Sequence, residues 1–195
     1  MSRGTLFLVV GPSGAGKDTL IRAVRAALDG DERVMFARRV VTRRGAHPTE
    51  DYETAGPDAF AARLAAGGFM LHWQAHGLEY GIPVVCAGAL SRGTDVVANV
   101  SRAVVAEAAE RFAPVCVIRV TAPAAVLAQR LRQRGREDPD AIDERLARIV
   151  PIPAGVRVVN IENTGTVADG ARAFLAALGR GSGAVPPQTS GTVRP

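Results

Sequence analysis

The segment Gly-Pro-Ser-Gly-Ala-Gly-Lys at positions 11–17 restricts the possible folds of this chain more than any other feature. It follows five apolar residues, 6–10, that read as a buried strand, and it precedes an amphipathic helical pattern that extends to about residue 28. A glycine-rich loop in this position turns its backbone N–H groups toward an anion, and the positive end of the helix dipole adds to the attraction. The segment therefore predicts a phosphate-binding loop in a parallel α/β sheet.

The loop and the first turn of the following helix are expected to hold the phosphates of a nucleotide. These residues are Gly11, Pro12, Ser13, Gly14, Ala15, Gly16, Lys17, Asp18 and Thr19. In the usual form of the loop, Ser or Thr follows the lysine directly and its hydroxyl binds Mg²⁺. Here Asp18 has that position, so its carboxylate either ligates Mg²⁺ as a hard oxygen donor or caps the amino end of the helix. The sequence favours neither alternative over the other.

The basic residues are unevenly divided between the two types, because Lys17 is the only lysine among 24 lysines and arginines. GC-rich coding bias is the simplest explanation for most of this skew. It does not explain why the one lysine lies in the phosphate loop. A compact ammonium group on a slim stem reaches between the β- and γ-phosphate oxygens, where a planar guanidinium would not fit.

The net charge of +5 is compatible with nucleic acid, anionic lipid or small polyanions as partners. Aromatic residues make up only 5% of the chain, and no stacking cluster accompanies the arginines, which argues against a nucleic-acid-binding module. The apolar run at 6–10 is too short for a signal peptide or a membrane span, so we expect a cytoplasmic protein. Cys86 and Cys116 lack the spacing of a zinc or redox site and are expected to be buried.

A length of 195 residues, 47% of them hydrophobic, predicts one domain with a real core. Strand and helix patterns alternate along it, as in a parallel sheet with helices on both faces. The tail at 180–195 is rich in Gly, Pro, Ser and Thr and is expected to be disordered, which leaves a domain over 1–179. The expected strands are 5–10, 34–41, 69–73, 95–99, 115–120 and 157–161, and the expected helices are 17–28, 58–66, 84–90, 102–112, 123–134 and 167–178.

Five short segments resemble one family of kinases. They are Gly-Pro-Ser-Gly-Ala-Gly-Lys-Asp-Thr at 11–19, Val-Thr-Arg-Arg at 41–44, Glu-Asp-Tyr at 50–52, Glu-Tyr-Gly at 79–81 and Arg-Leu-Arg-Gln-Arg-Gly-Arg at 130–136. Through them the chain resembles guanylate kinases and, more closely, their relatives the ribose 1,5-bisphosphate phosphokinases of bacterial phosphonate breakdown. The resemblance implies a three-layer, guanylate-kinase-like P-loop fold, with an acceptor-binding insertion over about 38–83 and an arginine-rich lid over about 134–150.

The same resemblance implies roles for particular side chains. In guanylate kinases the Thr-Arg segment and two tyrosines bind the acceptor phosphate, which points here to Arg43, Tyr52 and Tyr80, with Arg39 and Arg44 nearby. Guanidinium forks and phenolic donors suit a dianionic phosphate. The implied catalytic residues are those that close over ATP and stabilise the transferred phosphoryl group: Lys17, Arg130, Arg134 and Arg145.

Two features that guanylate kinases use to read guanine are missing. Leu71 stands where those enzymes have a glutamate, and Asn99 and Ser101 replace an acidic pair at the end of a strand. Without these acceptors the N–H groups of guanine would be desolvated and unpaired. GMP is therefore not the expected acceptor, and the closer resemblance to the phosphonate-pathway kinases implies phosphorylation of ribose 1,5-bisphosphate to 5-phosphoribosyl 1-diphosphate by ATP. Because the strand end lacks a carboxylate, Asp18 is a candidate Mg²⁺ ligand in its place.

The attacking oxygen in this reaction is already anionic, so no general base is required, and no role is assigned to His47, His72 or His76. A nucleoside monophosphate kinase with altered base choice is the alternative activity. An inactive, guanylate-kinase-like interaction domain is a second alternative, although the loop and the arginines would then have no use. The sequence does not indicate an oligomeric state.

Overall fold

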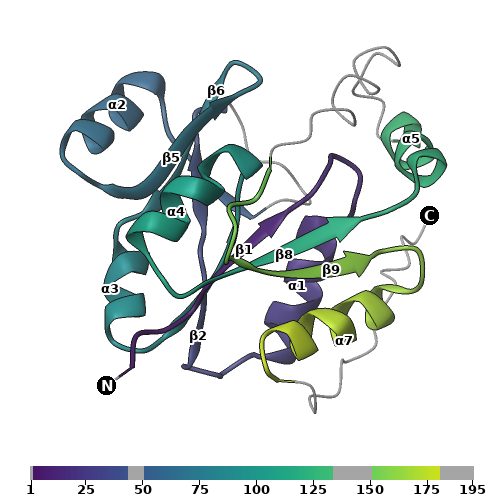
Figure 1. Ribbon diagram of the computed structural model, residues 1–195. Helices are drawn as coiled ribbons and strands as arrows, with labels where there is room; N and C mark the ends of the chain where they lie inside the picture. The colour runs from purple at the N-terminus through teal and green to yellow at the C-terminus, as the bar shows by residue number, and fades with distance from the viewer. Residues whose placement is uncertain (1, 44–50, 134–150, 181–195) are drawn as a thin grey trace.

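A computed structural model describes residues 2–43, 51–133 and 151–180 (Figure 1). Its main sheet has five parallel strands in the order β2-β7-β1-β8-β9. They are β1 (Leu6–Val10), β2 (Val34–Phe36), β7 (Asp95–Asn99), β8 (Val115–Thr121) and β9 (Arg157–Glu162). The helices are α1 (Lys17–Ala27), α2 (Pro57–Ala65), α3 (Val85–Ser91), α4 (Val105–Arg111), α5 (Ala124–Gln133) and α7 (Val167–Ala177), with a 3₁₀ turn η1 (Arg102–Val104).

The central strand β1 is buried along its whole length, as expected of a strand with parallel neighbours on both edges and helices on both faces. Leu6 and Leu8 pack in the core that includes residues of α3 and α4, whereas Phe7 and Val9 pack with residues of α1 and α7. This alternation forms the three layers visible in Figure 1 and confirms the predicted fold class. Within the described residues, no helix is long and apolar enough to cross a membrane.

A second, smaller sheet has four strands in the order β4-β3-β6-β5. These are β3 (Arg39–Val41), β4 (Tyr52–Thr54), β5 (Phe69–Ala75) and β6 (Leu78–Pro83). Helix α2 covers one face, where Val40 packs with Phe60 and Phe69, whose rings stack with centroids 4.6 Å apart. The hairpin between β5 and β6 turns through His76 and Gly77, both with positive φ, as in a type I′ turn.

Most predicted elements are present, with three differences. The run at 34–41 is divided between β2 and β3, which lie in different sheets. The polar segment after it contains β4, and the β5–β6 hairpin was not foreseen as a unit. All four strands of the small sheet fall within residues 38–83, whereas the predicted lid at 134–150 lies outside the described residues. The single domain over 1–179 stays a prediction.

Both cysteines are free and buried, as predicted. Cys86 lies in the core on the α3 and α4 side of the main sheet, and Cys116 lies in the core on the opposite side. Burial raises the pKa of the Cys86 thiol to about 11 and also raises that of Cys116. Neither side chain is placed to act as a nucleophile.

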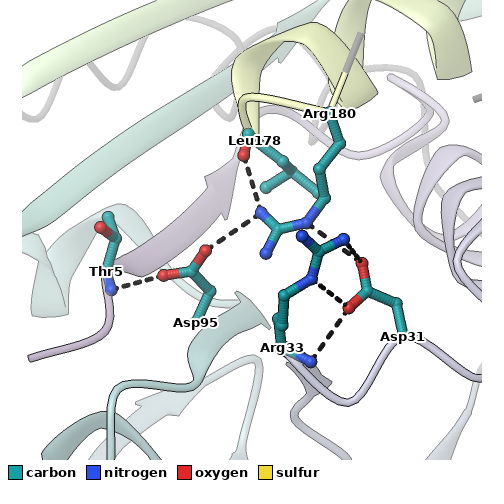
Figure 2. A network of polar contacts seen from close by, with 6 residues as sticks. All are labelled: Thr5, Asp31, Arg33, Asp95, Leu178 and Arg180. Carbon is teal, nitrogen blue, oxygen red and sulfur yellow. Dashed lines mark hydrogen bonds and ion pairs between the residues drawn. The ribbon is translucent and has the colours of Figure 1, made fainter. Parts of the chain in front are cut away.

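Arg180 ties the end of α7 to the amino ends of the main-sheet strands (Figure 2). Its guanidinium donates to Asp95 at 3.0 Å and to Asp31 at 3.4 Å. The other oxygen of Asp95 accepts from the backbone N–H of Thr5 at 2.7 Å. Hydrogen bonds from Arg33 hold the pKa of the Asp31 carboxyl well below its usual range. We call this cluster the C-terminal clasp; it lies at the amino ends of the strands, away from the glycine-rich loop.

Replacement of Gly81 by Ala should destabilise the small sheet. A Cβ on Gly81 would lie 2.5–2.8 Å from the ring of Phe69, which is held between the sheet and α2. Overpacking of this kind costs about 1–3 kcal/mol. The matched control is Gly88→Ala in α3, where the added Cβ meets only the end of the Arg92 side chain at 3.3 Å. Urea unfolding should show a loss for Gly81→Ala, and equal stability of the two variants would contradict this account of the packing.

Candidate active site

The glycine-rich loop leaves the carboxyl end of β1, between β7 and β8, where α/β sheets of this kind bind ligands. Gly11 has φ +149°, and a Cβ there would lie 2.0 Å from the carbonyl oxygen of Val120 on β8. Gly16 precedes α1 with φ +88°, and its Cβ would lie 2.4 Å from the side-chain amide of Asn163. The loop thus fits against two neighbouring segments only because these positions are glycine.

The ammonium group of Lys17 lies against the loop from which it projects. Its Nζ donates to the carbonyl oxygens of Gly11 at 2.8 Å and Pro12 at 3.0 Å. Backbone amides and one cation therefore share one small region at the amino end of α1. This is the donor set that binds the phosphates of a nucleotide in loops of this type.

Asp18, in the first turn of α1, connects the loop to two other segments. Its Oδ1 accepts a hydrogen bond at 2.8 Å from the side chain of Asn99, the last residue of β7. The same oxygen lies 3.7 Å from the guanidinium of Arg39, on β3 of the small sheet. Among the described residues both contacts with Asp18 fall on Oδ1. Sequence reasoning noted Asn99 only as the loss of an acid and did not foresee that its amide holds Asp18.

Arg130, to which the resemblance assigns a role beside ATP, reaches the loop from α5. Its two terminal nitrogens donate to the carbonyl oxygens of Gly14 at 3.4 Å and Asn163 at 3.1 Å. Asn163 in turn donates from its side chain to the carbonyl oxygen of Ala15 at 2.8 Å, and its backbone N–H donates to Thr121 at 2.7 Å. Two successive carbonyl groups of the loop, those of Gly14 and Ala15, are therefore held by residues distant in sequence.

Asn163 was missed by sequence reasoning. It is the only buried polar or charged residue in the described part of the chain, with 8% of its surface exposed. The signal that could have found it is its place directly after an apolar strand, because the carboxyl ends of parallel strands line the ligand site. Asparagines and aspartates are common after strands, however, and nothing in the local sequence connects this one to the loop.

Four of the predicted acceptor residues lie on one face of the small sheet. Arg39 and Tyr52 are neighbours across the β3–β4 pair, and Tyr80 is opposite Val41 across the β3–β6 pair. The guanidinium of Arg43 lies 5.8 Å from the ring centroid of Tyr52, and Tyr80 stacks on Trp73 with centroids 5.3 Å apart. Tyr52 is buried and Tyr80 is half-buried. Sequence reasoning did not anticipate Trp73 as the support of Tyr80.

Three predicted residues, Arg44, Arg134 and Arg145, lie outside the described residues. Within the described ranges there is no group of three His, Cys, Asp or Glu residues that could hold a metal ion. This is compatible with Mg²⁺, which is usually held by one or two carboxylates together with substrate phosphates rather than by a protein cage. Asp18 and the neighbouring hydroxyl of Thr19 are hard oxygen donors of the required kind.

Comparisons with known proteins show the family to which this chain belongs. The family profile described as "AAA domain" matches residues 6–150. Ribose 1,5-bisphosphate phosphokinase PhnN of Brucella melitensis biotype 2 is 45% identical over 174 residues, which cover 89% of this chain and 91% of that protein. Ribose 1,5-bisphosphate phosphokinase PhnN of Methylobacterium radiotolerans is 46% identical over 175 residues, which cover 90% of this chain and 97% of that protein. The chain belongs to the ribose 1,5-bisphosphate phosphokinase family.

Some proteins related to this ribose 1,5-bisphosphate phosphokinase family are longer. A bifunctional ribose 1,5-bisphosphokinase-thymidine phosphorylase of Azorhizobium caulinodans is 48% identical over 91% of this chain, which spans only 26% of that relative. Among solved structures, guanylate kinase from Anaplasma phagocytophilum superposes with a TM-score of 0.62 at 17% identity, covering 91% of this chain and 86% of that one. A gluconokinase from Sinorhizobium meliloti 1021 superposes with a TM-score of 0.51 at 19% sequence identity, and the match covers 92% of this chain and 94% of that one. These structures support the fold.

Asn163→Ala should loosen the phosphate loop. The substitution leaves the carbonyl oxygen of Ala15 without its hydrogen-bond partner, and such a loss costs about 1–3 kcal/mol. We expect nucleotide binding, measured by calorimetry, to weaken about tenfold. Asn160→Ala, three residues earlier at an exposed position of β9, is the matched control and should bind as the natural protein does. Equal affinities for all three proteins would show that the hydrogen bond from Asn163 to Ala15 does not shape the loop.

Proposed function

We propose that this protein transfers the terminal phosphoryl group of ATP to the 1-phosphate of ribose 1,5-bisphosphate, giving ADP and 5-phosphoribosyl 1-diphosphate. The observation that carries the proposal is the contact between Asp18 and Arg39, which joins a nucleotide-type phosphate loop to a sheet face bearing two arginines and two tyrosines. Two clusters suited to phosphate thus lie side by side. The names of relatives that match this chain over nearly their whole length support the same acceptor.

On the donor side, the backbone of the loop and Lys17 are proposed to bind the β- and γ-phosphates of ATP. Arg130, which approaches Gly14, adds positive charge beside them. Charge develops on the transferred phosphoryl group during the reaction, and fixed donors and cations lower the barrier by stabilising it. Arg134 and Arg145 are proposed to join this group from a lid over about 134–150.

On the acceptor side, Arg43, Tyr52 and Tyr80 are proposed to hold the reacting phosphate within the segment 38–83. Guanidinium and phenol groups donate hydrogen bonds to phosphate oxygens and carry no negative charge that would repel the phosphate. The attacking oxygen already carries negative charge, so the chain needs to supply orientation and charge neutralisation rather than a base. Among the described residues, the two histidines accordingly have no assigned role.

We further propose that Asp18, with Thr19, holds the magnesium ion of Mg-ATP. When bound, Mg²⁺ supplies neutralising charge between the phosphates of ATP. Asn99 donates to one oxygen of Asp18 and so fixes the direction of the carboxylate. This would explain why the strand end carries an amide, because a carboxylate there would repel Asp18 instead of orienting it.

The central experiment offers the purified protein Mg-ATP with ribose 1,5-bisphosphate, GMP or ribose 5-phosphate, and follows ADP release and product identity. Only the bisphosphate should give 5-phosphoribosyl 1-diphosphate. Lys17→Ala should lower kcat/KM about 10²- to 10³-fold, the usual effect of removing one transition-state donor. Arg22→Ala removes an exposed cation elsewhere on α1 and should have no effect. Turnover of GMP alone would overturn the proposed acceptor, and unchanged activity of Lys17→Ala would overturn the site.

Asp18→Ala should raise the Mg²⁺ concentration needed for half-maximal activity by about tenfold, the effect of losing roughly 1.4 kcal/mol of binding. Binding of ribose 1,5-bisphosphate without ATP should change much less. Asp18→Asn is a useful companion, because its side-chain oxygen can still accept from Asn99 while the negative charge is lost. Identical activity of natural and variant proteins at every Mg²⁺ concentration would leave Asp18 with a capping role only.

A further inference from the structure

A pair of stacked rings lies on the face of the small sheet that points away from α2. Trp73 on β5 and Tyr80 on β6 are direct cross-strand partners, and their ring centroids are 5.3 Å apart with the planes 5° from parallel. A Cβ on Gly81 would meet the ring of Phe69, which packs with Phe60 of α2. Because side chains alternate along a strand, the neighbouring Tyr80 and its partner Trp73 lie on the opposite face.

The two rings of this pair have different surroundings. Trp73 is buried, with 8% of its surface exposed, in the core that also contains Leu71 of β5 and Val104 of η1. The turn η1 lies directly against β5. Tyr80 packs at the margin of the same core and is only partly buried. The indole is therefore the member that the core holds in place, and the phenol is the member that a ligand can reach.

The stack with Trp73 sets the direction of the Tyr80 side chain. Within the described part of the chain, the hydroxyl of Tyr80 makes no hydrogen bond, and the indole is the only ring that stacks on the phenol. A phenol oxygen lies on the long axis of its ring, so a ring held in place also holds the oxygen. A donor that is positioned in advance loses little freedom when its ligand binds.

The segment that leads to Arg43 is tied to β6 beside Tyr80. The backbone N–H of Thr42 donates to the carbonyl oxygen of Glu79 at 3.1 Å, and the backbone N–H of Glu79 donates to the hydroxyl of Thr42 at 2.8 Å. Tyr80 is the next residue after Glu79, and Arg43 is the next residue after Thr42. The backbone of Tyr80 is thus fixed by the β3 side of the sheet, whereas its ring is fixed by Trp73 on the β5 side.

We propose that Trp73 is a positioning residue that acts through Tyr80. Its indole holds the phenol in the direction from which the hydroxyl donates to the reacting phosphate of the acceptor. This assignment rests on the proposed function, in which Arg43, Tyr52 and Tyr80 bind that phosphate. Without the indole, the Tyr80 side chain could adopt other rotamers, and the acceptor would have to restrict them on binding.

The test is a double-mutant cycle of Trp73→Leu and Tyr80→Phe, measured as kcat/KM for ribose 1,5-bisphosphate with Mg-ATP. Tyr80→Phe keeps the ring but removes the donor, so it should lower kcat/KM about 10- to 100-fold. Trp73→Leu alone should lower it about five- to tenfold, but by less than about twofold when Tyr80→Phe is present, because no hydroxyl is left to position. Gln74→Ala, at the exposed next residue of β5, is the matched control and should have no effect.

Two further measurements separate positioning from a role in the core. Binding of ATP, measured by calorimetry, should be the same in the natural protein and in each variant. Trp73→Phe keeps a ring that can stack on the phenol, so it should recover most of the kcat/KM lost in Trp73→Leu. Urea unfolding checks that each variant is folded, because Trp73→Leu also removes buried volume. Trp73→Met fills more of that volume and replaces Trp73→Leu in the cycle should the latter not fold.

Equal losses on replacing Trp73, with and without the Tyr80 hydroxyl, would overturn the assignment and leave Trp73 as a core residue. In that case the natural protein would still convert ribose 1,5-bisphosphate. Failure of the natural protein to convert it would overturn the proposed function, and the assignment of Trp73 with it.

Discussion

The burial of β1 on both edges and both faces is the constraint on which the rest of the structure depends. A strand enclosed in this way has only its ends near solvent, so its carboxyl end must turn out of the sheet at once. The glycine-rich loop performs this turn beside β8, and the following helix returns along the sheet. The backbone amides of the loop are thereby directed at the one position where neighbouring strand ends converge.

Helix α1 then determines how the small sheet sits against the main one. Asp18 contacts Arg39, and seven residues further along the helix Arg25 forms an ion pair with Asp51, just before β4. Residues seven apart share one face of a helix, so a single face of α1 contacts both β3 and the start of β4. The hydrogen bond from Arg25 is the main reason that the pKa of the Asp51 carboxyl lies below its usual value. The helix that begins at the phosphate loop therefore also contacts the small sheet at β3 and at the start of β4.

The parts of this arrangement that sequence could predict are those set by local chemistry. The loop, the apolar strands around it and the amphipathic helices each leave a pattern within a few residues. The small sheet does not, because β3 and β4 are three residues long and pair across segments distant in sequence. The division of the run at 34–41 has no marker either, since Ala37 and Arg38 are not turn residues. The role of Asn163 could not be predicted from local sequence either, because its contact with Ala15 spans 148 positions.

The surroundings of each arginine indicate which of these residues serve the fold and which suit a ligand. Arg180 donates to two carboxylates in the C-terminal clasp, so its charge is offset within the protein. Arg130 donates, among the described residues, only to carbonyl oxygens of the loop and of Asn163. Neutral carbonyls orient a guanidinium without cancelling its charge, whereas a carboxylate does both. Arg130 therefore keeps its charge beside the loop, whereas the charge of Arg180 is offset at the amino ends of the strands. A chain of net charge +5 can in this way concentrate its attraction for polyanions where the phosphate loop opens.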